Sequence, residues 1–149
     1  MFERALSTIS YQPQVKATFR ELRKRKYKTA IVSGGFKTLA DRALRDLKID
    51  HAFAGCELLW SKSGKLVHSN LLPSDYEGKL AFMKLIMREH GLKKAQCAFV
   101  GDGANDIPFA KAMGLSIAFN ASPSLQKVCT YAINQKPGKE DFREILRYF

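Results

Sequence analysis

The sequence predicts an α/β protein with a mostly parallel sheet that is covered by helices on both faces. Three observations support this prediction: short apolar runs alternate with segments of helical periodicity, two of these runs end in glycine-rich turns, and one pair has the pattern of a β-hairpin. A chain of 149 residues with 46% hydrophobic residues is long enough to bury a core of its own. We therefore expect residues 1–149 to form a single domain.

The first third of the chain is predicted to hold two helices on either side of a strand. Residues 11–26 carry apolar side chains at helical spacing, and the apolar residues 29–32 follow as a strand. The serine and two glycines at 33–35 are expected to break this strand. An amphipathic helix is then expected over residues 36–47.

The next elements are a short strand at 52–54 and a β-hairpin, whose strands 57–60 and 65–68 flank a turn at 61–64. The second half continues the alternation of helices and strands. Helices are expected over 74–90, 106–113, 122–128 and 139–149, and strands over 98–100, 115–119 and 130–133.

The most informative segment is VGDGAND at residues 100–106, which closes the strand at 98–100. Its glycines permit a sharp turn and close backbone approach to a ligand, and Asp102 and Asp106 offer the hard oxygen ligands that Mg²⁺ requires. A nearby helix start needs only one carboxylate as a cap, so the pair on either side of Gly103 favours a cation site over capping alone. The sequence therefore predicts Mg²⁺ at this strand end, where α/β proteins bind ligands.

The turn at 33–35 has two interpretations. It could be only a tight turn with a helix cap, because serine and glycine commonly serve both purposes. Alternatively, the Ser33 hydroxyl and the amides after it could point at a phosphate, helped by the dipole of the following helix. Neither glycine turn forms a dinucleotide-binding or P-loop motif. Lys79, near the start of the helix expected at 74–90, indicates by itself only a solvated helix residue.

The chain is strongly basic, with 25 Lys and Arg against 14 Asp and Glu and a net charge of +11. Such a charge favours phosphorylated ligands and polyanions. The densest basic run, at residues 20–28, coincides with the end of a predicted amphipathic helix, so we interpret it as a solvated helix face. No zinc finger, helix-turn-helix or RNP motif supports nucleic-acid binding instead.

The remaining composition excludes several classes. Cys56, Cys97 and Cys129 are widely spaced and odd in number, which favours buried reduced thiols over disulfides or a metal knuckle. No segment has the length of a membrane-spanning helix, and the first residues lack the layout of a signal peptide. We expect a cytosolic protein without a membrane partner.

Taken together, three motifs resemble those of the haloacid dehalogenase superfamily. Ser33-Gly34-Gly35 after one strand, Lys79 early in a later helix and GDGANDI at 101–107 after another strand look like the family's second, third and fourth motifs. The greatest likeness is to phosphoserine phosphatases. It includes the hairpin at 57–68 and residues 111–119 and 141–146. The resemblance implies a three-layer Rossmannoid fold and a Mg²⁺-dependent phosphomonoesterase that acts on a phosphorylated small molecule, with phosphoserine as the candidate.

By this resemblance, Ser33 and the Gly34 amide would hold the phosphoryl group, and Lys79 would neutralise charge on it. Asp102 would ligate Mg²⁺, while Asp106 would hold either metal-bound water or Lys79 in place. Asn105 would add hydrogen bonds at the phosphate and the metal. Lys79 and Asp106 would then be the catalytic residues. This assignment agrees with the chemistry, because phosphoryl transfer depends mainly on positioning and on neutralisation of charge.

The sequence departs from the family pattern at the first motif, Asp-x-Asp-x-Thr, which supplies the aspartyl nucleophile and the general acid. No Asp-x-Asp occurs in the 149 residues. We therefore expect the family's first strand, which is central in its sheet, and its helical cap to be missing. Either the strands that end at Ser33 and Asp102 would pair directly, or another chain or a rearranged N-terminus would fill the slot, with residues 5–9 as a weak candidate. Exposed sheet edges of this kind predict self-association.

Three functions remain, in this order. The first is a phosphoserine-phosphatase-type phosphomonoesterase completed by another polypeptide, with hydrolysis by the isolated chain very weak or absent. The second is a non-catalytic module that binds phosphate or a partner protein. The third is a nucleic-acid binder, whose binding would depend strongly on salt and be indifferent to Mg²⁺ chelation.

Overall fold

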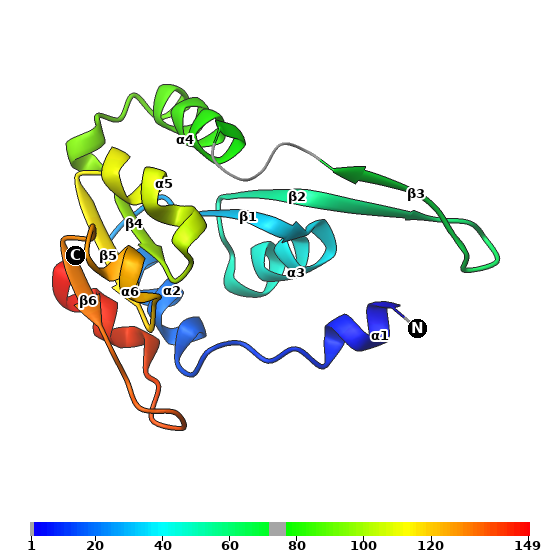
Figure 1. Ribbon diagram of the computed structural model, residues 1–149, viewed down its shortest axis with the longest axis horizontal. Coiled ribbons are helices and arrows are strands. Elements are labelled where there is room, and N and C mark those ends of the chain that lie inside the picture. Colours follow the sequence, from blue (N-terminus) through cyan, green and yellow to red (C-terminus); the bar gives the residue numbers. More distant parts are fainter. Residues whose placement is uncertain (1, 72–76) are drawn as a thin grey trace. The chain divides into compact units, whose positions relative to one another are not determined.

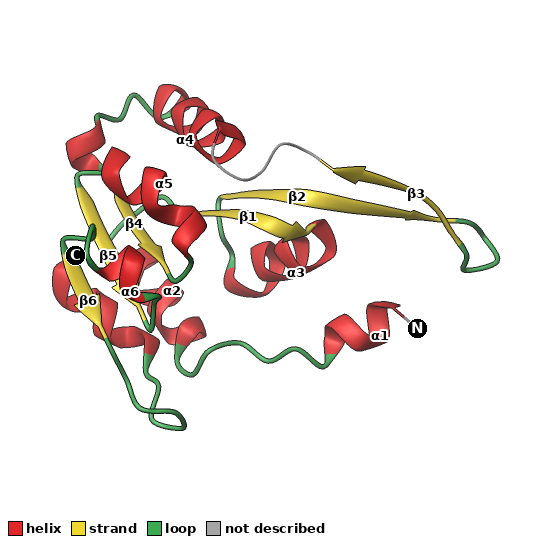
Figure 2. Cartoon of the chain, in the orientation of Figure 1, coloured by secondary structure: helices red, strands yellow, loops and turns green. Residues whose placement is uncertain are grey.

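A computed structural model of the chain describes residues 2–71 and 77–149. The chain divides into two compact units, which are described separately below. Unit 1 comprises Met1–Ser74 and Asp141–Leu146, and unit 2 comprises Asp75–Glu140 and Arg147–Phe149. Each unit contains one three-stranded sheet with helices packed against it, as expected for an α/β protein (Figures 1 and 2). The expectation of one domain over residues 1–149 stays a prediction.

Unit 1 has a sheet of order β1-β2-β3, in which β1 is parallel to β2 and β2 is antiparallel to β3. Helix α3 packs against β1 and β2, and α2 packs against α3 (Figure 1). The elements are α1 (Phe2–Ser7), α2 (Val15–Lys24), β1 (Ala30–Phe36), α3 (Lys37–Leu47), β2 (His51–Trp60) and β3 (Leu66–Leu71). A core cluster formed by Val15, Ala43, Leu47 and Ile49 joins the helices to the sheet.

Helix α2 buries Val15, Thr18 and Leu22, which recur at helical spacing. It is shorter than the predicted helix over 11–26, because Gln14 adopts a left-handed conformation with φ 65° just before its first turn. The basic side chains of residues 23–26 are exposed. The interpretation of the basic run as a solvated face therefore agrees with the structure.

The prediction that β1 ends at the turn 33–35 was wrong. β1 continues to Phe36, and its register with β2 shifts between Ser33 and Phe36, where pairing resumes at Cys56. The glycines thus produce an irregularity inside a strand rather than its end. The strands expected at 52–54 and 57–60 likewise merge into the single strand β2.

The predicted β-hairpin is confirmed. β2 and β3 are antiparallel, with Glu57 opposite Asn70 and Leu59 opposite His68. The Ser61 amide donates a hydrogen bond to the Lys65 carbonyl at 2.8 Å. Gly64 in this turn has a φ of 77°, a left-handed conformation that favours glycine.

Unit 2 has a fully parallel sheet of order β4-β5-β6. Its core cluster contains Phe99, Ala110, Ala118 and Leu125. The elements are α4 (Glu77–Glu89), η1 (Lys94–Gln96), β4 (Ala98–Gly101), η2 (Ala104–Asp106), α5 (Ile107–Ala112), β5 (Leu115–Phe119), α6 (Pro123–Gln126) and β6 (Tyr131–Ile133). The three predicted strands are found, and the start of the helix predicted at 74–90 lies outside the described residues.

The ends of the chain differ from expectation. Residues 142–148 form a 3₁₀-helix, η3 (Phe142–Tyr148), instead of the expected α-helix over 139–149. The suggestion that residues 5–9 form a replacement strand was wrong, because α1 occupies most of this segment. Within residues 2–71 and 77–149, β1 pairs only with β2 and β4 only with β5, so each has one edge without a strand neighbour. In the same residues, the structure has no helix that is both long and apolar enough to span a membrane.

Candidate phosphate and metal site

Lys79 and Asp106 form an ion pair in unit 2. The Lys79 Nζ donates a hydrogen bond to Asp106 Oδ1 at 2.8 Å, and the two side chains are only 6% and 13% exposed. Lys79 lies in the first turn of α4, and Asp106 ends the 3₁₀ turn η2 after β4. The interpretation of Lys79 as a solvated helix residue is therefore wrong. An ammonium group at this depth requires a compensating charge, which Asp106 provides.

The backbone of the loop holds Asp106 in place. Its Oδ2 accepts a hydrogen bond from the Gly103 amide at 3.3 Å, and its own amide donates to the Gly103 carbonyl at 3.1 Å. A Cβ atom on Gly101 would lie 2.2 Å from the Phe99 ring and 2.9 Å from Asp106 Oδ2. Glycine at position 101 is thus required by the close approach of the strand end to Asp106.

Asp102 differs from Asp106 in its surroundings. Its side chain is exposed, and its carbonyl accepts a hydrogen bond from the Ser122 amide at 2.9 Å, which ties the strand end to the start of α6. Within the part of the chain that the structure describes, its carboxylate has no hydrogen-bond or ion-pair partner. One carboxylate of the loop is therefore free to bind a cation, and the other is paired.

This donor set fits a magnesium ion. Mg²⁺ is commonly held by one or two carboxylates while it keeps several waters, and an exposed carboxylate at a strand end suits that mode. Asp102 is the residue that would hold the ion directly. The oxygens of Asp106 already accept hydrogen bonds from Lys79 and Gly103, which favours a supporting position for this residue.

Asn105 lies on the same loop and is exposed. A Cβ atom on Gly103 would lie 2.3 Å from Asn105 Oδ1, so the absence of a side chain at 103 lets the Asn105 amide fold back over the loop. The structure thus places Asp102, Asn105 and Asp106 on one loop and brings Lys79 into contact with it.

Ser33 and Gly34 lie near the carboxyl end of β1 in unit 1. The Ser33 hydroxyl accepts a hydrogen bond from the Gly35 amide at 3.0 Å, and Gly34 is exposed. The residue that precedes the first turn of α3 is Phe36, which makes no side-chain capping bond. The interpretation of this serine as the cap of the following helix is therefore not supported by the geometry.

One neighbour of the site was missed at the sequence level. Burial raises the pKa of the Cys129 thiol, a hydrogen bond with Ser116 lowers it, and the nearby Asp106 carboxylate raises it further. The three cysteines are free and half-buried, which agrees with the expectation of reduced thiols but not with full burial. Nothing in the sequence pattern indicates that Cys129 lies near the loop, because the packing of β6 beside β5 brings it there.

Comparison with known proteins identifies the family. The model of the haloacid dehalogenase-like hydrolases matches residues 3–114. The chain belongs to this family. The haloacid dehalogenase resemblance drawn from the GDGAND and Ser-Gly-Gly motifs is confirmed.

The relatives include several phosphoserine phosphatases. That of Methanocaldococcus jannaschii is 36% identical over 149 residues, which cover 98% of this chain and 67% of the relative. That of Streptococcus thermophilus is 33% identical over 136 residues, or 91% of this chain and 62% of the relative. That of Lactococcus lactis is 36% identical over 113 residues, or 74% of this chain and 50% of the relative. The haloacid dehalogenase-like chain therefore spans between half and about two thirds of the length of these relatives.

Solved structures give the same result for the fold. A substrate-bound phosphoserine phosphatase complex superposes with a TM-score of 0.87 at 34% identity, covering 99% of this chain and 68% of that one. A structure described as a phospho-aspartyl intermediate analogue of phosphoserine phosphatase gives the same values. The predicted α/β haloacid dehalogenase-type fold, with a mostly parallel sheet and a β-hairpin, is confirmed.

Proposed function

We propose that the chain forms the magnesium- and phosphate-binding part of a phosphomonoesterase of the phosphoserine phosphatase type. The observation that carries this proposal is the buried ion pair between Lys79 of α4 and Asp106 of the loop after β4. The same loop presents the exposed Asp102 carboxylate. Relatives that are 33–36% identical are phosphoserine phosphatases, which supports phosphoserine as the first substrate to test. Such an activity would place the protein in the formation of serine, and we expect it in the cytosol.

The residues of this loop would act by neutralising charge. A bound Mg²⁺ supplies a Lewis acid for a phosphoryl oxygen. The Lys79 ammonium donates one of its three N–H groups to Asp106 and would donate the others to a phosphoryl group. The Asn105 amide adds a neutral donor. Because Asp106 fixes the ammonium before a ligand arrives, little reorganisation is needed on binding.

The proposal also assigns phosphate contacts to the Ser33 hydroxyl and the Gly34 amide. The support is the likeness of Ser33-Gly34-Gly35 to the second motif of the family and the exposure of Gly34. Backbone amides and hydroxyl groups are common ligands of phosphate in α/β proteins.

A second candidate function is a non-catalytic module that binds phosphate. The observation that favours it is the absence of Asp-x-Asp from the 149 residues, since this pattern carries the aspartyl nucleophile in the family. A non-catalytic module would bind phosphate in the presence of Mg²⁺ without hydrolysing a phosphate ester. Nucleic-acid binding is a weaker candidate, because several basic side chains of α2 already have partners: Glu21 binds Lys24 and Arg25, and Arg23 donates to the Leu47 carbonyl.

The test is the release of phosphate from phospho-L-serine by the purified chain with Mg²⁺, beside Asp106→Asn and Asp102→Asn. Circular dichroism verifies that each variant is folded. Release that both variants lose would support the phosphomonoesterase and imply a nucleophile outside the Asp-x-Asp pattern. Equal background in all three proteins would contradict hydrolysis by this chain alone, which is the result expected if another polypeptide supplies the nucleophile or if the chain only binds phosphate.

A further inference from the structure

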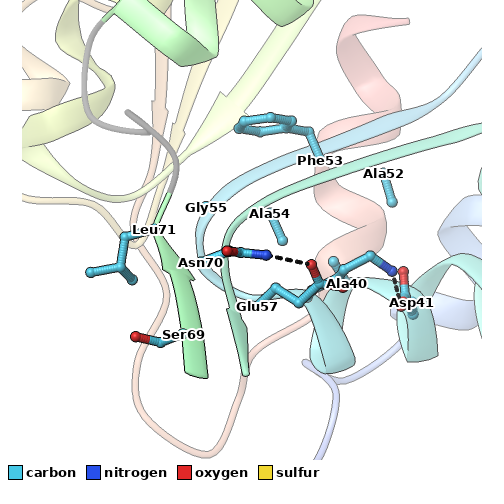
Figure 3. Close-up of a pocket in the computed structure, with 11 residues that line it drawn as sticks. Ala40, Asp41, Ala52, Phe53, Ala54, Gly55, Glu57, Ser69, Asn70 and Leu71 are labelled. Atoms are coloured by element: carbon cyan, nitrogen blue, oxygen red, sulfur yellow. Dashed lines mark hydrogen bonds and ion pairs between the residues drawn. The ribbon is translucent and has the colours of Figure 1, made fainter. Parts of the chain in front are cut away.

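Unit 1 contains a pocket of about 510 Å³ between α3 and the β2–β3 hairpin, beside its Ser33-Gly34-Gly35 segment, because the lining residue Ala54 is paired with Ser33. Its apolar lining includes the small residues Ala54 and Gly55, the larger Phe53 of β2 and Leu71 of β3 (Figure 3). Its polar side chains come from three elements: Lys37 and Asp41 on α3, Glu57 on β2, and Ser69 and Asn70 on β3. The pocket thus combines an apolar surface with charged, hydroxyl and amide groups.

The charges in this pocket are not balanced. The Lys37 ammonium donates a hydrogen bond to Asp41 Oδ2 at 2.6 Å, so these two charges compensate each other. That hydrogen bond raises the pKa of Lys37, and the charge of Glu57 adds to the effect. Glu57 is left as an extra carboxylate. Among the described residues, the lining therefore carries one more negative than positive group, in a chain of net charge +11.

The Glu57 carboxylate keeps unused acceptor capacity. Its Oε2 accepts a hydrogen bond of 3.4 Å from the Asn70 amide, and Figure 3 shows these two side chains directed toward each other. This is a long bond, and an ionised carboxylate has about four acceptor positions. Among the described residues, no other hydrogen bond to the Glu57 side chain is found.

We propose that this pocket binds a small molecule that carries a primary ammonium group. The ammonium group would donate to the Glu57 carboxylate, and a short aliphatic chain would lie over Ala54 and Gly55. An anionic ligand is disfavoured, because Lys37, the only cation among the described residues of the lining, is already paired with Asp41, whereas Glu57 would repel the ligand. The inference is independent of the proposed phosphatase function.

The first experiment is a titration of n-butylammonium into the ¹⁵N-labelled chain, followed by NMR. We expect saturable shifts at amides 54–57 and 69–71, with a dissociation constant on the order of millimolar for so small a ligand. Butyrate, an anion of the same length, should leave these amides unchanged. Butyrate that shifts the same amides, or shifts from butylammonium elsewhere only, would overturn the proposal.

Two charge-matched variants test the role of Glu57. Glu57→Gln should weaken butylammonium binding about tenfold or more, because a charge-assisted hydrogen bond is replaced by a neutral one. Glu140→Gln removes the same charge in unit 2 and should bind as the unmodified chain does. Equal affinity of the Glu57→Gln variant and the unmodified chain would contradict the assignment.

A variant that is expected to bind butylammonium more tightly distinguishes loss of a ligand contact from misfolding. Ser69→Asp adds a carboxylate to the lining and should tighten binding of butylammonium several-fold, a result that a structural defect would not produce. Unchanged or weaker binding would count against the proposal. L-2-Aminobutyrate tests whether the ligand is an amino acid or a simple amine. Binding at least as tight as that of butylammonium assigns the pocket to amino acids, and weaker binding assigns it to simple amines.

Discussion

At the scale of single residues, the two carboxylates of the loop after β4 have different roles. Asp106 pairs with the buried Lys79, while Asp102 projects to solvent with a carboxylate that lacks a partner in the described residues. The same residue type, four positions apart, is therefore paired inside the fold at one position and is proposed to bind a cation at the other.

Replacement of Asp106 by Asn should destabilise the fold by about 3 kcal/mol, because it leaves the buried Lys79 charge uncompensated. Urea denaturation followed by circular dichroism measures this loss. Asp102→Asn is the matched control and should change the free energy of unfolding by less than about 0.5 kcal/mol. A similar loss in both variants would contradict the division of roles.

The sequence could predict part of this site. The GDGAND loop was predicted from its glycines, which permit a sharp turn, and from its two carboxylates, which are hard oxygen ligands for a cation. Lys79 could be assigned only through resemblance to a family. Its burial depends on the packing of α4 beside the loop, and no local pattern at position 79 encodes that packing.

At the scale of elements, Asp50 connects the starts of β1 and β2. It accepts hydrogen bonds from the Thr29 amide at 2.9 Å, the Thr29 hydroxyl at 3.1 Å and the Lys28 ammonium at 3.2 Å. Burial alone would raise the pKa of Asp50, but these hydrogen bonds outweigh it and lower the pKa. Their contribution to stability is therefore present above the usual aspartate pKa of about 4 and is lost as the pH falls below it.

Asp50→Asn should lower the free energy of unfolding by about 1 kcal/mol at pH 7, a modest value because the side chain is 33% exposed. The difference from the unmodified chain should shrink as the pH falls below about 4 and through the lowered pKa of Asp50, below which Asp50 of the folded unmodified chain is itself protonated. Urea titrations at several pH values provide the measurement. A difference that stays constant down to pH 2 would argue against the charge of Asp50 as the cause.

Arg42 joins the segment before α2 to α3. Its guanidinium donates to the Leu6 carbonyl at 2.7 Å and the Ile9 carbonyl at 2.5 Å, and it lies 4.9 Å from the centre of the Tyr11 ring. Arg42→Met should remove these contacts and raise the hydrogen-exchange rate of amides 5–11 by about tenfold. Arg45→Met, which changes an exposed arginine of the same helix, is the control. Unchanged exchange in the Arg42 variant would show that other contacts hold the segment.

Elements with a strong local pattern were predicted well, and those decided by pairing were not. The β2–β3 hairpin has turn residues between two apolar runs, and it forms where expected. The sequence at 33–35 has equally strong turn residues, yet β1 continues past them because Phe36 pairs again with Cys56. Such a continuation depends on the neighbouring strand, which a local pattern does not encode.

At the scale of the whole molecule, each of the two sheets has an edge strand that ends in a glycine-containing segment: β1 in unit 1 and β4 in unit 2. Within the described residues, β1 and β4 each lack a neighbour on one side, and both lead into a glycine-containing segment proposed to bind phosphate or metal. Unpaired edges tend to recruit further strands. We propose that another strand, from a second copy or a different chain, covers these edges.

In the absence of a different chain, a second copy would cover the edges, so the purified protein should self-associate. Size-exclusion chromatography with light scattering at increasing concentration measures this association, and the apparent mass is expected to rise above that of one chain. A clean, stable monomer at high concentration would contradict the prediction.

The family and the α/β fold could be predicted because they depend on alternating elements and on a specific motif. The division into two compact units could not, because length and composition do not reveal how contacts are distributed along a chain. The net charge of +11 gives no information about the fold. It agrees with phosphate binding and with many other functions.

The most direct test of the central claim is a calorimetric titration of inorganic phosphate into the chain with and without Mg²⁺. We expect saturable binding that requires Mg²⁺ and is lost in Asp102→Asn, although that variant keeps its fold. Phosphate binding that is equal with and without Mg²⁺, or that persists in Asp102→Asn, would contradict the assignment of the loop after β4 as a magnesium and phosphate site.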